Sequence, residues 1–137
     1  MAVQRLPNVQ IYFRFYGDSF DPDEITQRLG IEPTLKFRPG DPITSDGRGR
    51  RRRYGWAVKV GGYDTIEIDG MLQELREQVS VSSFLVRKVC KDLDIEPVIV
   101  CGVGAERADI MPALYFPTDF LRWAAEMGAS LDVDVLR

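Results

Sequence analysis

The densest group of chemically active side chains in the sequence is a run of arginines. Five of the 18 basic residues lie within six positions, at Arg48 and at 50–53. Guanidinium groups bind phosphate through paired hydrogen bonds, so the run could hold a small anion or single-stranded nucleic acid. Without it, 13 basic residues face 21 acidic ones, a balance of −8. An acidic body disfavours nucleic acid as a partner, and a solvated basic loop is the favoured interpretation.

Acidic residues form the second group. Asp18, Asp21, Asp23 and Glu24 are close in sequence, but their spacing does not fit a calcium loop, and capping of a helix accounts for them. Two carboxylates in Asp132-x-Asp134 would share one face of a strand, as the polar side of an amphipathic strand does. We therefore predict no metal site.

Other familiar chemistry is lacking. The chain has no histidine, which removes the usual base of nucleophilic hydrolases. Cys90 and Cys101 lie in apolar surroundings and are predicted to be buried thiols. The segment 102–107 lacks the third glycine of a dinucleotide-binding fingerprint and reads as a turn. We expect no catalytic residues and no cofactor.

The elements that would position these residues begin with a strand and a helix. From Val9 to Tyr16 apolar and polar residues alternate, which predicts a half-buried strand with Tyr12 and Tyr16 on its open face. These rings could stack bases, but cross-strand packing or a dimer interface is favoured. A helix follows, with Asp21 as its cap and Gly30 at its end.

The remaining pattern alternates strands and helices. Turn residues predict a long loop over 39–53, and a strand begins at Trp56. Gly61-Gly62 predicts a turn, and 65–68 either forms a short strand or leads into helix. Periodicity then predicts, in order, two short helices or one kinked helix over 71–93, a buried strand over 97–103, a strand over 110–116, a helix from Thr118 to Gly128 and a strand over 131–135.

This order predicts a single α+β domain over residues 1–137, with a mainly antiparallel sheet and helices packed on one face. Segments 20–31 and 116–129 each place a capped helix between strands and end it before glycine. That repetition adds the expectation of two ferredoxin-like halves.

The long loop marks the most plausible ligand site. A loop of this length is usually functional or mobile, and beside an aromatic strand it forms a natural concavity. We place a candidate ligand-binding site where Arg38, Asp41, Arg53 and Trp56 could converge. For Trp56 alone, burial in the core is the favoured interpretation.

Motifs near both ends of the chain resemble a known family. They are Tyr16-Gly17-Asp18-x-Phe20-x-Pro22-Asp23-Glu24-Ile25, Leu29-Gly30-Ile31-Glu32-Pro33-Thr34, Gly40-Asp41, Gly55-Trp56, Leu121, Gly128-Ala129-Ser130-Leu131-Asp132 and Asp134. Together they resemble the bacterial domain-of-unknown-function family numbered 4279 over nearly the whole chain. The resemblance implies a small bacterial α+β domain and carries no site residue over. The arginine run is longer and more basic than expected of that family.

These observations favour a non-enzymatic binding or interaction module, such as an immunity-type antidote that neutralises a toxin. The partner would be another protein or a second copy of the chain, as in a homodimer. The alternative is an anion or single-stranded nucleic-acid binder that uses the loop at 48–53. No segment approaches the roughly 20 apolar residues of a membrane span, and no secretion signal opens the chain, so a cytoplasmic location is expected.

Overall fold

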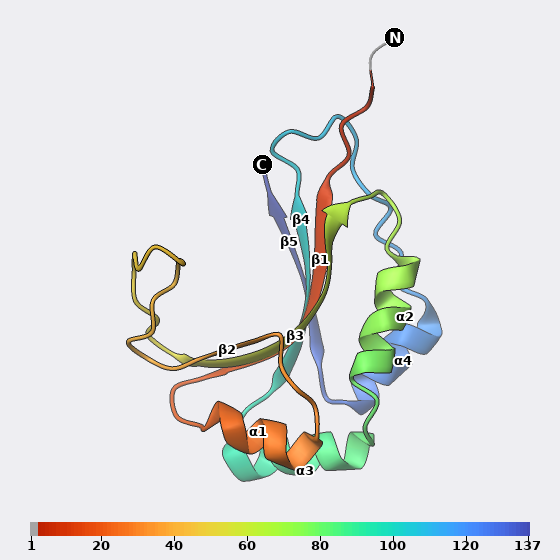
Figure 1. The fold of residues 1–137 in the computed structure, drawn as a ribbon. Helices are drawn as coiled ribbons and strands as arrows, with labels where there is room; N and C mark the ends of the chain where they lie inside the picture. The colour runs from red at the N-terminus through yellow and green to blue at the C-terminus, as the bar shows by residue number, and fades with distance from the viewer. Residues whose placement is uncertain (1–2) are drawn as a thin grey trace.

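The structure is a computed structural model that describes residues 3–137, and its strands all join one sheet (Figure 1). In chain order the elements are β1 (Asn8–Gly17), α1 (Pro22–Leu29), β2 (Leu35–Phe37), β3 (Tyr54–Asp64), α2 (Asp69–Gln78), α3 (Ser83–Leu93), β4 (Pro97–Gly104), α4 (Thr118–Glu126) and β5 (Ser130–Leu136).

The sheet has the strand order β2-β3-β1-β4-β5, with β1 at its centre. Neighbouring strands are antiparallel except for β4 and β5, which are parallel and joined by α4. The predicted α+β class with a mainly antiparallel sheet is confirmed. The expectation of two ferredoxin-like halves is not, because β4 and β5 are direct neighbours whereas β3 lies between β1 and β2.

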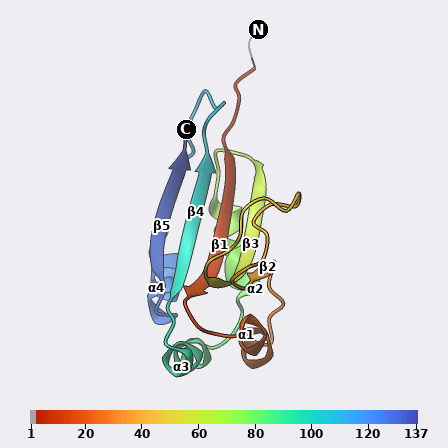
Figure 2. The ribbon, with the colours of Figure 1, turned by 90° about the vertical axis from the view of Figure 1, so that its left-hand side faces the viewer.

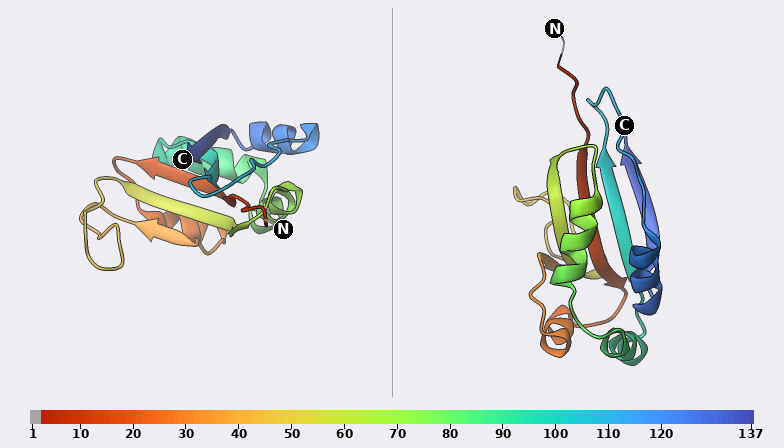
Figure 3. Two further views of the ribbon diagram at one scale, coloured as in Figure 1. Left: turned by 90° about the horizontal axis from the view of Figure 1, so that it is seen from above. Right: turned by 90° about the vertical axis from the view of Figure 1, so that its right-hand side faces the viewer.

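One face of the sheet is convex and carries all four helices. On β1 this face consists of Val9, Ile11, Phe13 and Phe15, none of which has any exposed surface. Helices α2 and α4 cover the upper part of the face, whereas α1 and α3 lie under its curved lower end (Figures 1 and 3). The alternation of β1 thus builds one core on one side, since every second side chain points there.

The other face is concave and has no helix against it within residues 3–137. Figure 2 shows β5, β4, β1 and β3 side by side and uncovered, with the segment between β2 and β3 curling in front. That segment, residues 38–53, is an irregular hairpin rather than an open loop. Backbone hydrogen bonds join Gly40 N–H to Arg51 O at 2.9 Å and Arg51 N–H to Asp41 O at 2.8 Å. We call it the arginine hairpin.

The predicted helix starts are largely confirmed. The Asp21 carboxylate accepts a hydrogen bond from the Asp23 N–H at 2.9 Å, and Gly30 ends α1 with a φ of 69°. Ser82 caps α3 through the Leu85 N–H at 3.1 Å, so the segment over 71–93 forms two helices. The helix predicted from Thr118 to Gly128 is α4, which begins at Thr118 after Pro117 and has no side-chain cap.

The glycine pair at 61–62 does not make the predicted turn. Both residues lie within β3 with φ values of 83° and 87°, at a shift of register opposite Val9 and Gln10. An extra residue in one strand is a β-bulge, and positive φ explains the glycines. The strand continues to Asp64, and 65–68 leads into α2.

The strand predicted over 110–116 is also wrong. These residues have no regular secondary structure and pair with no strand of the sheet, and a backbone hydrogen bond joins Ala113 N–H to Ile66 O at 3.3 Å. Pro112 lacks a backbone donor, and its neighbours run past α2 toward α4 rather than along a sheet edge. The segment is therefore a connection between β4 and α4.

Candidate binding site on the concave sheet face

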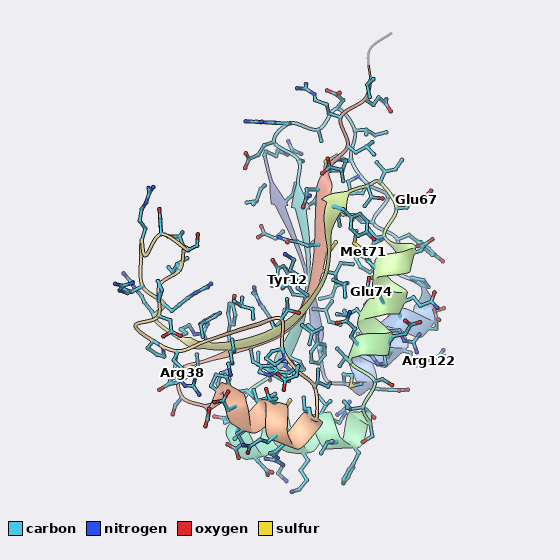
Figure 4. All side chains as sticks on the ribbon, in the orientation of Figure 1. Tyr12, Arg38, Glu67, Met71, Glu74 and Arg122 are labelled. Carbon is cyan, nitrogen blue, oxygen red and sulfur yellow. The ribbon has the colours of Figure 1, made fainter. Side chains whose placement is uncertain are left out.

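The concave face holds a hollow of about 490 Å³. We call it the concave groove. Tyr12 points into it from the middle of β1, as Figure 4 shows. Most of its polar and aromatic lining comes from β1, with additions from the arginine hairpin and β5, namely Gln10, Tyr12, Arg14, Tyr16, Arg51 and Asp134.

Two glycines of β4 give the groove its depth, because they have no side chains. Gly102 and Gly104 lie on the concave side, where register pairs them with Gln10 and Asn8 of β1. A Cβ at Gly102 would lie 3.5 Å from Gln10 Cγ, an ordinary contact distance, so a side chain would fit but would fill the hollow. The two glycines thus keep this part of the sheet open.

The opposite end of the groove is built on a ring that lies against the backbone. Phe37 of β2 is buried, and its ring covers Gly55 of β3 so closely that a Cβ there would overlap it. The Tyr16 ring meets Phe37 edge to face, with centroids 5.5 Å apart. Glycine is therefore required at this position to seat the aromatic pair.

Two guanidinium groups flank this aromatic pair. Arg51 Cζ lies 3.9 Å from the centroid of Phe37, and Arg14 Cζ lies 4.2 Å from the centroid of Tyr16. Each such contact is worth roughly 0.5–1 kcal/mol at a partly exposed site. The buried Nε of Arg51 has no hydrogen-bond partner within residues 3–137.

The charges of the groove are unbalanced. Among the described residues, Arg14 and Arg51 of the groove have no carboxylate oxygen within 4.0 Å, and neither has Lys59, which lies opposite Tyr12 on the same sheet face. Asp132 and Asp134 project from the same face on β5, at the other side of β4, and form no ion pair there either. The groove is therefore cationic toward β1 and β3 and acidic along β5.

Tyr12 stands between these two regions. Partial burial raises the pKa of its phenol above the ordinary value of 10.0, and the neighbouring Tyr16 adds to the shift. The Gln10 side chain opposes this rise in pKa by hydrogen bonding to the phenol. At neutral pH Tyr12 is an uncharged hydroxyl that can donate or accept a hydrogen bond.

Comparison with protein families identifies the chain. The family described as Domain of unknown function (DUF4279) matches residues 7–136, nearly the whole length. The chain belongs to this family. No curated protein and no solved structure matches it.

In this DUF4279 domain, the predicted site residues separate into two places. Arg38 and Asp41 meet at the base of the arginine hairpin, where the Asp41 carboxylate accepts the Arg38 N–H at 2.8 Å. The Arg38 guanidinium turns toward α1 and pairs with Asp21 at 2.7 Å and Asp23 at 3.1 Å (Figure 4). These two residues therefore tie the hairpin to α1.

The other two predicted residues do not join them. Arg53 lies near Asp18, with Nε 3.4 Å from the carboxylate oxygen. Trp56 has no exposed surface, and its ring lies on the convex side, where Nε1 donates to Thr26 Oγ1 at 3.0 Å. Burial of Trp56 in the core agrees with the alternation of β3, and Tyr16, which lies beside the hairpin on the concave face, is half-buried.

The arginines of the DUF4279 domain also differ from one another. Arg48 pairs with Asp46 at 2.8 Å, and Arg50 donates to Gly47 O at 3.2 Å. Arg52 is exposed, and Arg51 alone of the run lines the groove. The polar residues on one face of β1 are the sequence signal that indicates this site. Arg51 lies over that face only because the hairpin closes.

Neither metal nor thiol chemistry is assembled in the described residues of the DUF4279 domain. No three of their metal-ligating side chains are grouped closely enough to hold an ion. Burial raises the pKa of the Cys90 thiol to about 11 and also raises that of Cys101, so both are protonated at neutral pH. No helix of residues 3–137 has the length and apolarity to cross a bilayer.

Proposed function

We propose that this protein is a non-enzymatic binding module that holds an anionic ligand in the concave groove. One observation carries the proposal. Arg14, Arg51 and Lys59 lie on the sheet face without helices and have no acidic partner within residues 3–137. Unpaired cations in a partly enclosed hollow attract negative charge more strongly than cations in open water.

The groove also limits the form of the ligand. Guanidinium edges favour phosphate or carboxylate, and the rings of Tyr12 and Tyr16 favour a flat or apolar group next to it. Asp132 and Asp134 repel anions at the β5 side, so the charge of the ligand belongs at the β1 and β3 side. A ligand with one anionic end fits better than a uniformly charged polymer.

Thermal unfolding with three probes tests this proposal. The probes are tripolyphosphate, a short oligothymidylate and a short glutamate peptide. We expect at least one to raise the Tm in low salt and less so in high salt, because charge pairing at a surface is screened. An unchanged Tm with all three would contradict the proposal, and the effective probe identifies the anionic group.

A matched pair of variants locates the binding. Arg51→Gln should lower the affinity for the effective probe by roughly tenfold, because it removes a charged donor from the groove. Arg52→Gln is the control, because Arg52 is exposed and forms no ion pair within residues 3–137. Arg122→Gln on α4 is a second control, on the convex side (Figure 4). Equal losses in all three variants would indicate nonspecific attraction to positive charge.

We also propose, as a second function, binding of a basic protein partner, as an immunity-type antidote does with a toxin. The support is the exposed acidic strand β5, which carries Asp132 and Asp134. A bacterial and cytoplasmic setting belongs to this proposal. Co-expression with the product of an adjacent gene tests it: relief of growth arrest caused by that product is expected, and arrest that persists would contradict it. Light scattering over a range of concentrations tests self-association as a homodimer.

A further inference from the structure

The outer edge of β5 is a row of unused backbone hydrogen-bonding groups. The strand ends the sheet, and Figure 2 shows no ribbon beyond it on that side. Its residues from Asp132 onward are all exposed. Such an edge is a template on which another extended chain can add as a further strand.

The geometry of the ladder identifies which groups are unused. Leu136 O accepts a hydrogen bond from Ala105 N–H at 2.7 Å, so the backbone groups of Leu136 face β4. The N–H and C=O groups of successive residues in a strand point to opposite sides. The groups of Leu131, Val133 and Val135 therefore face away from the sheet, within the described residues.

The side chains of β5 form two rows, one on each face of the sheet. Asp132 and Asp134 project on the concave side, and register places them beside Val100 and Gly102. Val133 and Val135 project on the convex side and are 46% and 36% exposed. The strand has no proline, lysine or bulge to prevent strand addition, and its only charged side chains, Asp132 and Asp134, disfavour an acidic or identical strand rather than a basic one.

We propose that β5 binds an extended segment of a partner protein in which basic and apolar residues alternate. Its basic side chains would lie beside Asp132 and Asp134, and its apolar side chains beside Val133 and Val135. A second copy of β5 fits poorly, because antiparallel pairing centred on Val133 places Asp132 opposite Asp134 of the other copy. Opposite charges across strands stabilise the pairing and like charges oppose it.

Amide hydrogen exchange in the presence of a designed peptide tests this inference. The probe is a blocked seven-residue peptide of alternating lysine and valine, equal in length to β5. We expect it to slow exchange at Leu131, Val133 and Val135 by about tenfold or more near saturation, because their N–H groups become bonded. Exchange at Asp132 and Asp134 should change little, since their amides face β4.

Variants of the strand separate edge pairing from simple charge attraction. Val133→Pro removes an outward N–H without removing a bond to β4, and should abolish peptide binding. Val133→Thr is the matched control and should bind normally. If Val133→Pro fails to fold, the double variant Asp132→Asn and Asp134→Asn gives the second test, with an expected loss of roughly fivefold.

Three results would overturn the proposal. The first is unchanged exchange at Leu131, Val133 and Val135 when the peptide is in excess. The second is protection of these amides that needs no peptide and rises with protein concentration, which would make a second copy the occupant. The third is a loss of peptide binding in Arg52→Gln as large as that in the double aspartate variant, because Arg52 is exposed on the arginine hairpin and lies outside β5.

Discussion

The two faces of the sheet differ although one strand supplies the middle of both. Phe13 of β1 is fully buried under helices, whereas the next residue toward the N-terminus, Tyr12, is half-buried in an open groove. The apolar row attracts the helices because it removes apolar surface from water. The polar row gains nothing comparable from a helix and stays open. Stability is thus concentrated on the convex face, and the concave face is the one that we propose for ligand binding.

The largest effect that separates the faces is expected from alanine at adjacent positions of β1. Phe13→Ala should lower the free energy of unfolding by about 4 kcal/mol, because it leaves a cavity in the core. Tyr12→Ala should lower it by only about 1 kcal/mol, since its ring is partly solvated already. Urea unfolding of the two variants gives both values. Similar losses would show that the concave face also carries the stability of the fold.

A smaller effect is expected from adding a methyl group to each end of the groove. Gly55→Ala should destabilise by about 2 kcal/mol, because the new Cβ overlaps the buried Phe37 ring. Gly102→Ala meets only ordinary contacts, and should change stability by less than about 1 kcal/mol. The added methyl group of Gly102→Ala should still weaken the binding of an anionic ligand, because it fills part of the hollow. The Tm of each variant, with and without that ligand, measures both effects.

The smallest effect concerns Asp23 of α1, which joins this helix to Lys36 and Arg38. Lys36 and Arg38 hydrogen bond to this carboxylate and lower its pKa below the ordinary 3.8. A lowered pKa in the folded state favours folding above the ordinary carboxyl pKa, and the contribution is lost as the pH falls below it. Asp23→Asn should therefore flatten the decline of stability between about pH 5 and pH 2.

Chemical unfolding at several pH values in that range checks the slope. Glu67→Gln is the control, because this exposed carboxylate forms no ion pair within residues 3–137. A parent-like slope in Asp23→Asn would show that the hydrogen bonds from Lys36 and Arg38 to this carboxylate do not contribute to the pH dependence of stability.

Local patterns predicted much of the fold. The alternation of β1 indicated both faces correctly, and Asp21 and Gly30 marked the ends of α1 because caps act over a few residues. The alternation over 131–135 likewise predicted β5. These features depend on neighbours in sequence, which are visible without any knowledge of the fold.

The errors arose where distant segments decide the outcome. Gly61-Gly62 suits a turn as well as a bulge, and only pairing with β1 selects the bulge. The apolar residues over 110–116 suit a strand, but both sides of β4 are already occupied by β1 and β5. The groove depends on the hairpin that folds Arg51 over Phe37, a contact that no local pattern encodes.

The central position of β1 has a consequence for the order in which the protein forms during synthesis. Phe13 lies opposite Val58 of β3 and Ile99 of β4, so the first strand made needs partners from the middle and the last third of the chain. Pairing between segments so far apart in sequence is slow. On the ribosome β1 can pair on one side once β3 has emerged, but its other side has no partner until β4 follows, so its apolar row stays incompletely covered during that interval.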